Sequence, residues 1–226
     1  MKRSQINALI EETIVWLKEM KVSLPPFAYW TTEEWASKGH EYDEIRENML
    51  GWDVTDYGRG DFDKVGLLLF TIRNGNLENP KYAKLYAEKM LISEVGQLSP
   101  NHFHWHKMED IINRGGGTLM LQLWNSTPGE ELDSTDVTVR IDGRTCTVPA
   151  GGKVFLKPGE SITLASGVYH LFTAEDEKVL AWEVSMVNDD QTDNRFYEAQ
   201  ARFTSIEEDE PKKYLLCNEY PEYKNV

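Results

Sequence analysis

Three of the five histidines in the chain, His102, His104 and His106, lie in one short stretch that also holds Lys107 and Glu109. Imidazole and carboxylate groups together suit divalent transition metals such as manganese, iron, nickel and zinc. Because side chains alternate across a β-strand, a strand here would point His102 and His104 into the same site. Glu109 has the opposite parity, so the chain must bend before it if all are to hold one metal.

A second stretch adds a distant histidine, His170, after another glycine-punctuated strand pattern. A lone histidine in a polar strand is more often a chance residue than a ligand. The H-x-H spacing, the nearby carboxylate and the distant histidine together are typical of a metal or catalytic site. We therefore predict a divalent metal centre.

The chain is strongly acidic, and this restricts its partners. The formal net charge is −14 at pH 7, which disfavours nucleic acid, because phosphate backbones need clustered Lys and Arg. It also disfavours anionic membranes. A neutral substrate such as a sugar or another polyol fits this balance, although charge alone does not select one.

The length of 226 residues and the hydrophobic content of 40% are those of a globular chain able to bury a sizeable core. Its two cysteines, Cys146 and Cys217, form no C-x-x-C pair and suggest no disulfide framework. The first residues lack the apolar run of a signal peptide, and the longest apolar run, residues 65–70, is too short to span a bilayer. We expect a soluble cytoplasmic protein.

The first 50 residues predict helices. Apolar residues recur at helical spacing after Ser4, which can cap a first helix, and the pattern stops at two consecutive prolines. Thr31 and Glu34 form a capping box for a short second helix, and a third helix is expected over residues 42–50. These elements are too few for an independent domain, so we expect a helical cap packed on a sheet.

Strands dominate the rest of the chain. Asp142-Gly143 between two β-branched runs is a strong hairpin signal. Short strands at this spacing are typical of a sandwich, jelly roll or barrel. The predicted strands cover residues 65–73, 82–95, 117–124, 137–141, 144–148, 153–156, 161–164, 168–173 and 179–187. We expect one domain over residues 1–226, with a β-barrel core over 65–187 and a C-terminal extension over 188–226.

Three segments lie outside these patterns. Residues 51–62 hold three glycines, three aspartates and three aromatics, so we expect an ordered loop anchored by buried rings. The alternative is a wall of the substrate site. Residues 206–213 are expected to be a solvated charge run, and residues 214–217 to return to the sheet or meet a second subunit.

The two histidine stretches resemble the motifs of the cupin family. The first motif, G-x5-H-x-H-x3,4-E-x6-G, is matched at every position by Gly96, His102, His104, Glu109 and Gly116. The second, G-x5-P-x-G-x2-H-x3-N, is matched by Gly159, Gly167 and His170, with Ala165 in place of the proline and Ala174 in place of the asparagine. The resemblance implies an all-β cupin, a double-stranded β-helix or jelly-roll barrel. It also implies that the metal is held by His102, His104, Glu109 and His170.

This assignment leaves His106 without a metal. The alternative ligand pair, His104 and His106, would leave only two residues before Glu109 and would break the cupin spacing. We interpret His106 as a neighbour of the site or a surface residue.

Within the cupins, nearly the whole chain resembles the D-lyxose ketol-isomerases. This resemblance rests on residues 25–28, 51–56, 58–62, 102–105, 109–117, 123–126, 183–185 and 187–190. It implies a manganese-dependent, dimeric, cytoplasmic enzyme. The implied reactions interconvert D-lyxose with D-xylulose and D-mannose with D-fructose.

Such an enzyme must move hydrogen between C1 and C2 of an open-chain sugar. Either a base takes the C2 proton to give a cis-enediol, or a metal assists a hydride shift. Glu183 lies in a mostly apolar strand, and we expect it to face inward with a raised pKa and to act as the base; the alternative is the solvent face. Lys107 is expected to donate a hydrogen bond to the developing oxyanion, unless it is a surface lysine.

The remaining assignments are Glu109, as a catalytic residue as well as a ligand, and Asp190 and Arg195, as weaker candidates for hydroxyl contacts. Two other functions stay open. A cupin dioxygenase would hold iron on the same ligands, and a non-enzymatic cupin would bind sugar without turnover. Lys107 and Glu183 favour proton transfer over oxygen activation, and acid and base groups beside an intact ligand set disfavour a passive binding module.

Overall fold

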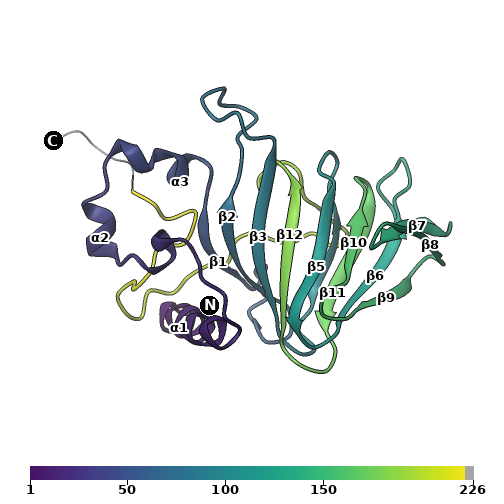
Figure 1. The fold of residues 1–226 in the computed structure, drawn as a ribbon, viewed down its shortest axis with the longest axis horizontal. Coiled ribbons are helices and arrows are strands. Elements are labelled where there is room, and N and C mark those ends of the chain that lie inside the picture. Colours follow the sequence, from purple (N-terminus) through teal and green to yellow (C-terminus); the bar gives the residue numbers. More distant parts are fainter. Residues whose placement is uncertain (222–226) are drawn as a thin grey trace.

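The computed structural model describes residues 1–221, whose strands form two facing antiparallel sheets (Figure 1). The larger sheet has eight strands in the order β1-β2-β3-β12-β5-β10-β7-β8, and the smaller has five in the order β13-β4-β11-β6-β9. The predicted all-β cupin fold, a jelly roll with an N-terminal helical cap, is confirmed. No helix among the described residues is long and apolar enough to cross a membrane.

The strand bounds follow the predicted pattern with a few exceptions. The larger sheet contains β1 (Gly51–Thr55), β2 (Leu67–Arg73), β3 (Tyr86–Ser93), β5 (Glu109–Gly116), β7 (Val137–Ile141), β8 (Arg144–Val148), β10 (Ser161–Leu164) and β12 (Val179–Met186). The smaller contains β4 (Ser99–Phe103), β6 (Leu119–Asn125), β9 (Gly152–Leu156), β11 (Val168–Ala174) and β13 (Arg195–Phe196). The hairpin at Asp142-Gly143 joins β7 and β8 as predicted.

The larger sheet is buried on both faces near β1. In β2, Leu67 and Leu69 pack in the core between the two sheets, whereas Leu68 and Phe70 pack in the cluster that the first helix covers. Successive side chains of a strand point to opposite faces. Because β2 is covered on both faces, its sequence is a continuous apolar run rather than an alternation. The same change of direction along a strand sends polar residues of neighbouring strands into the space between the sheets.

The helices gather at the β1 end of the larger sheet (Figure 1). They are α1 (Arg3–Glu19), α2 (Thr32–Ala36) and α3 (Asp43–Glu47), with short 3-10 turns at Pro26–Tyr29 and His40–Tyr42. The capping box of α2 is confirmed, since the N–H of Glu34 donates to Thr31 Oγ1 at 3.2 Å. The prediction that Ser4 caps α1 is wrong. Ser4 lies inside the first turn, and its N–H and hydroxyl donate to the carboxylate of Asp209.

Residues 206–213 are exposed or half-buried, as expected for a solvated charge run, but this run is also bound to the first helix. Its carboxylates contact α1: Asp209 accepts from Ser4, and Glu208 Oε1 lies 2.8 Å from Nη2 of the fully buried Arg3. Residues 214–217 return to the sheet as expected, since the N–H of Cys217 donates to the carbonyl of Trp52.

Three further predictions are corrected by the observed helices and strands, and one strand was missed. The expected loop over 51–62 begins with the fully buried strand β1, although Trp52 and Tyr57 are buried rings as expected. The long strand over 82–95 is only β3, and the third helix is only five residues long. Strand β5 had no predicted counterpart. Its polar residues and the two glycines at its end hid it, although its burial pattern is a regular alternation.

Candidate active site

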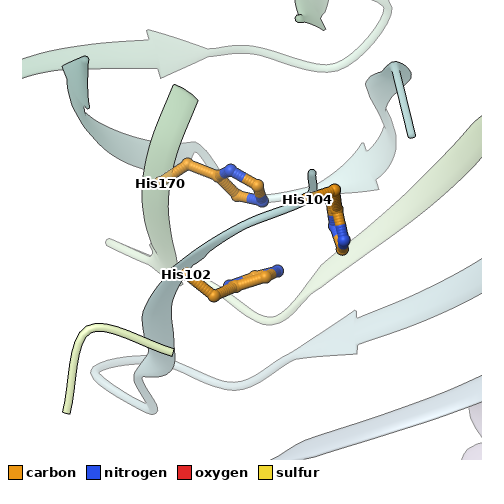
Figure 2. A group of neighbouring side chains, drawn as sticks. All are labelled: His102, His104 and His170. Carbon is orange, nitrogen blue, oxygen red and sulfur yellow. The ribbon is translucent and has the colours of Figure 1, made fainter. Parts of the chain in front are cut away.

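The three histidines predicted as ligands converge between the sheets (Figure 2). His102 and His170 are direct cross-strand partners on β4 and β11, and His104 follows immediately after β4. Figure 2 shows the rings turned toward one another, and one nitrogen from each lies within 4.8 Å of the others. His106 is exposed on the surface, as expected.

Each of these imidazoles has its Nδ1 atom beside a main-chain carbonyl oxygen: 2.8 Å for His102 and Pro100, 2.7 Å for His104 and Asp193, and 3.0 Å for His170 and Val168. Because a carbonyl only accepts, each Nδ1 must donate, which leaves Nε2 for a ligand. Burial and the neighbouring cationic and imidazole groups lower the pKa of His102 and of His104. Both are therefore neutral near pH 7, as metal ligands must be.

Glu109 reaches the same point from the larger sheet, where it is the first residue of β5. Its Oε1 lies 3.0 Å from Nε2 of His170, and its Oε2 lies 3.5 Å from Nε2 of His104. Nε2 of a neutral imidazole and a carboxylate oxygen are both acceptors, so a cation held by both would make this close approach favourable. Two ligands at right angles on a metal with bonds of about 2.1 Å would lie about 3 Å apart. The donor set therefore fits a divalent transition metal.

Lys107 is buried between two carboxylates. Its Nζ lies 2.8 Å from Oε2 of Glu109 and 2.8 Å from Oε1 of Glu183. Burial alone would lower the pKa of Lys107, but the two carboxylates outweigh it and raise this pKa. The lysine therefore stays an ammonium, and the alternative of a surface lysine does not hold.

Glu183 faces inward because it shares the parity of the core residues Val179 and Ala181 on β12. The expected rise of its pKa is wrong. Burial would raise it, but the ammonium groups of Lys107 and Lys89 outweigh burial and lower the pKa below its ordinary value. Glu183 is therefore a carboxylate at neutral pH.

Lys89 was not predicted. It is the direct cross-strand partner of Glu183, its Nζ lies 3.6 Å from Glu183 Oε2, and it donates to Asn188 Oδ1. A signal was present in the sequence, because Lys89 has the parity of Leu91 and a lysine on the apolar side of a strand needs a partner.

A second polar group lines the cavity from the C-terminal extension. Nη1 of Arg202 lies 2.7 Å from Asp53 Oδ2, and its Nε donates to Asp190 Oδ1 at 3.1 Å. Burial would raise the pKa of Asp190, but Arg202 outweighs it and lowers this pKa. Of the two residues predicted to contact sugar hydroxyls, Asp190 lines the cavity. Arg195 does not line it, and its Nε lies 2.7 Å from Oε2 of Glu130. Nothing in the sequence around Arg202 marked it.

Asp193 fixes the connection between β4 and β5. Its carboxylate accepts the N–H groups of His106 and Lys107, both at 2.9 Å, and its carbonyl oxygen accepts Nδ1 of His104. One residue of the C-terminal extension therefore orients both a ligand and the buried lysine. The cavity lined by the three imidazoles, Lys107, Glu109 and Glu183 has a volume of about 50 Å³.

The jelly roll and its buried cluster of three histidines and a carboxylate define a cupin with a candidate metal centre next to acid–base groups. The comparisons narrow this class. The D-lyxose isomerase family model matches residues 1–220, and the chain belongs to that family.

Two curated relatives match over almost their whole length. The D-lyxose/D-mannose isomerase of Escherichia coli O157:H7 is 45% identical over 99% of this chain and 100% of its own. The protein of the same name from Serratia proteamaculans is 46% identical over 97% of this chain and 98% of its own.

Solved structures share the fold at low sequence identity. The L-ribose isomerase of Acinetobacter sp. DL28 in complex with L-ribose superposes with a TM-score of 0.62 at 14% identity, covering 92% of this chain and 98% of that one. The Cellulomonas parahominis L-ribose isomerase with L-psicose gives 0.61 at 13% identity, with the same coverage.

Proposed function

We propose that this chain is a metal-dependent aldose–ketose isomerase that interconverts D-lyxose with D-xylulose and D-mannose with D-fructose. The observation that carries the proposal is the buried lysine bridge: Lys107 Nζ lies 2.8 Å from both Glu109 and Glu183, beside three converging imidazoles. The two relatives named D-lyxose/D-mannose isomerase support this choice of sugars. They also favour it over a dioxygenase or a passive sugar-binding module.

The proposed ligands are His102, His104, Glu109 and His170, and the proposed ion is Mn²⁺, which accepts both nitrogen and oxygen donors. When bound, a divalent ion would act as a Lewis acid that polarises the sugar carbonyl and stabilises developing negative charge. Each imidazole is held in the ligand tautomer by a carbonyl hydrogen bond. The chain itself therefore orients the donors.

Glu183 is the proposed base that takes the C2 proton and returns it to C1. Its Oε1 accepts from Lys107 and, at 3.0 Å, from Ser185 Oγ. Its Oε2 faces Lys89 at 3.6 Å, beyond hydrogen-bond distance, and is free to receive a proton. Lys107 remains protonated and donates a hydrogen bond to the sugar oxygen that gains negative charge.

The sugar hydroxyls farther from the reacting carbons are the proposed partners of Asp190 and Arg202, which both line the cavity. The paired guanidinium of Arg202 offers donors and the carboxylate of Asp190 offers acceptors. Arg195, also assigned to hydroxyl contacts from the sequence, is the weaker proposal because Glu130 already pairs with it.

The deciding experiment offers D-lyxose, D-mannose and D-xylose separately to Mn²⁺-loaded protein and measures ketose. We expect product from the first two sugars and little from D-xylose, which has the opposite configuration at C2. Oxygen consumption without ketose would support the dioxygenase, and sugar binding without turnover would support the passive module.

Three further properties are proposed from the family resemblance: a homodimer, a cytoplasmic location, and a single domain with its barrel core over residues 65–187. Light scattering after size-exclusion chromatography measures the oligomeric state. Limited proteolysis tests the domain boundaries, because cleavage should concentrate in segments that are not packed on the core.

A further inference from the structure

A second pocket lies beside the catalytic cavity, on the other side of the segment that follows β12. Its volume is about 200 Å³, and residues 47–49, 74–78 and 187–192 line it. Asp190 lines both this outer pocket and the catalytic cavity. The two spaces are therefore neighbours with a common wall.

The catalytic cavity is too small for a sugar as it stands. Its volume of about 50 Å³ is room for only a few water molecules, at roughly 10–15 Å³ each. The outer pocket has about four times that volume. A sugar that approaches from this side meets the outer pocket first, and the catalytic cavity has to widen to admit it.

The lining of the outer pocket is polar and rich in hydrogen-bond acceptors. It holds the amides of Asn48, Asn74, Asn76, Asn188 and Gln191 and the carboxylates of Glu47, Glu78, Asp189 and Asp190, with no Lys or Arg among its lining residues. A phosphorylated ligand is thereby disfavoured, because nothing neutralises its charge. Hydroxyl groups of a neutral polyol, which donate as well as accept, match these side chains.

One buried acceptor atom in this lining, Oδ1 of Asn48, has no hydrogen-bond partner. Asn48 is only 3% exposed. Its Nδ2 donates to the carbonyl of Asn74 at 3.1 Å, but its Oδ1 accepts no hydrogen bond. A buried acceptor without a donor is costly. Oδ1 has almost no exposed surface, so a ligand hydroxyl would relieve that cost once the side chain turned toward the pocket.

The segment that separates the two spaces connects the outer pocket with Lys107 and Lys89. On the outer side, Asn188 is held by Asn74 through two hydrogen bonds of 3.0 and 2.9 Å. On the inner side, Asn188 Oδ1 accepts from Lys107 at 3.2 Å and from Lys89. A ligand that contacts Asn74 is therefore one residue away from the groups that hold Lys107.

We propose that the outer pocket is a second binding subsite for neutral polyols, which holds a sugar before it passes the wall at residues 188–190. This inference rests on the proposed function. It adds a place where sugar binds outside the reacting centre.

The first test is direct binding of D-mannitol, which has no carbonyl and cannot be isomerised. In the full-length protein loaded with Zn²⁺, which is diamagnetic and does not broaden nearby signals as Mn²⁺ would, mannitol should shift the backbone amide NMR signals of Gly75, Asn76 and Thr192. If none of these signals moves at saturating mannitol, the subsite is disproved, whatever the outcome of the isomerase assay. Shifts in a protein that turns over no sugar would keep the subsite and reject the proposed function.

The second test fills the pocket from its rim. Leu77 and Leu85 are 72% and 73% exposed, but only Leu77 lines the pocket, so Leu85→Trp is a matched control for Leu77→Trp. The exposed Gln191 gives a second variant, Gln191→Trp. We expect both pocket variants to lose the mannitol shifts and to lower kcat/KM for D-lyxose roughly tenfold through KM, with unchanged metal content. Unchanged KM in both variants would overturn the proposal, as would an equal loss in Leu85→Trp.

Discussion

Lys107 contacts two carboxylates to which we assign different roles: Glu109 as a ligand and Glu183 as the base. Its ammonium group holds the pKa of both below the ordinary range, against the effect of burial. At neutral pH both are therefore ionised, one ready to bind a cation and the other ready to accept a proton. A carboxylate with a lowered pKa is a weaker base, so catalysis must rely on position and on stabilisation of the enediolate.

The base assignment is tested by Glu183→Gln. The amide keeps the size of the side chain and can still accept from Lys107, so folding and metal content should stay unchanged. Turnover should fall by about three orders of magnitude, within the range for loss of a general base. The measurements are kcat, metal content by elemental analysis, and solvent deuterium in the product of the wild-type reaction. An active variant, together with a product free of deuterium, would favour a metal-assisted hydride shift.

The ligand assignment is tested by His170→Ala. Loss of one of four ligands should weaken metal binding at least tenfold, as measured by titration of the metal-free protein. His106→Gln is the matched control, because His106 is exposed and lies outside the converging group. Full metal occupancy in His170→Ala would contradict the proposed ligand set. An empty site in His106→Gln would instead support the alternative in which His104 and His106 are the ligand pair.

At the scale of elements, the connection between β4 and β5 is held in place by Asp193. Replacing it by Ala frees the N–H groups of His106 and Lys107 together. We expect Asp193→Ala to weaken metal binding by roughly tenfold, the lower end for loss of an outer-shell partner, and to leave the fold intact by circular dichroism.

Asp133→Ala is the control for this change, because Asp133 caps a turn at the N–H of Thr135, away from the proposed ligands. It should bind metal like the wild type. Equal losses of affinity in the two variants would mean that Asp193 has no particular role in positioning the ligands.

Local patterns predicted much of the sheet. Alternation and the Asp142-Gly143 turn located β7 and β8. The motif from Gly96 to Gly116 selected His102, His104 and Glu109, and the motif that starts at Gly159 selected His170. Strand β1 was missed because both of its faces are buried, so a run containing Trp52 and Asp53 shows no alternation. Its cover comes from elements distant in sequence, which local patterns do not reveal.

Two site residues of the C-terminal extension could not be predicted from local patterns either. Asp193 and Arg202 lie on either side of the short strand β13, which pairs with β4, and the chain then reaches β1, where Thr55 contacts Arg202. Their positions follow from tertiary contacts, and neither periodicity nor a motif encodes them. The pKa of Glu183 was predicted in the wrong direction for a related reason: burial was inferred from the apolar strand, but the pairing of Glu183 with Lys107 and Lys89 arises only in the folded structure.

At the scale of the whole molecule, the first helix contacts the C-terminal extension. The fully buried Arg3 contacts Glu208 and Glu219, and Lys212 Nζ donates to Glu219 at 2.8 Å. Burial would raise the pKa of Glu219, but the hydrogen bonds from Arg3 and Lys212 outweigh it, and this pKa lies below its ordinary value of 4.5.

This contact predicts a dependence of stability on pH. Because the folded pKa of Glu219 is lowered, the stabilisation is fully present above pH 4.5 and is lost as pH falls through the folded pKa. Glu219→Gln should reduce the free energy of unfolding by about 1.5–3 kcal/mol at pH 7, the scale of hydrogen bonds to charged groups. Urea denaturation at pH 7 and pH 3 should show this difference shrinking. A difference that stays constant would mean that the charge of Glu219 does not contribute.

The candidate ligands belong to both layers of the sandwich: His102 and His170 to the smaller sheet and Glu109 to the larger. An ion shared by them would tie the layers together, and an unfolded chain would not offer it the same site. Binding would then add to folding stability, by about 2.7 kcal/mol when free metal exceeds Kd a hundredfold. We expect the thermal midpoint to rise with Mn²⁺ and to fall with a chelator. In a cell starved of the metal, the protein would unfold more often and be degraded faster. The supply of the metal would then set the abundance of the protein as well as its activity.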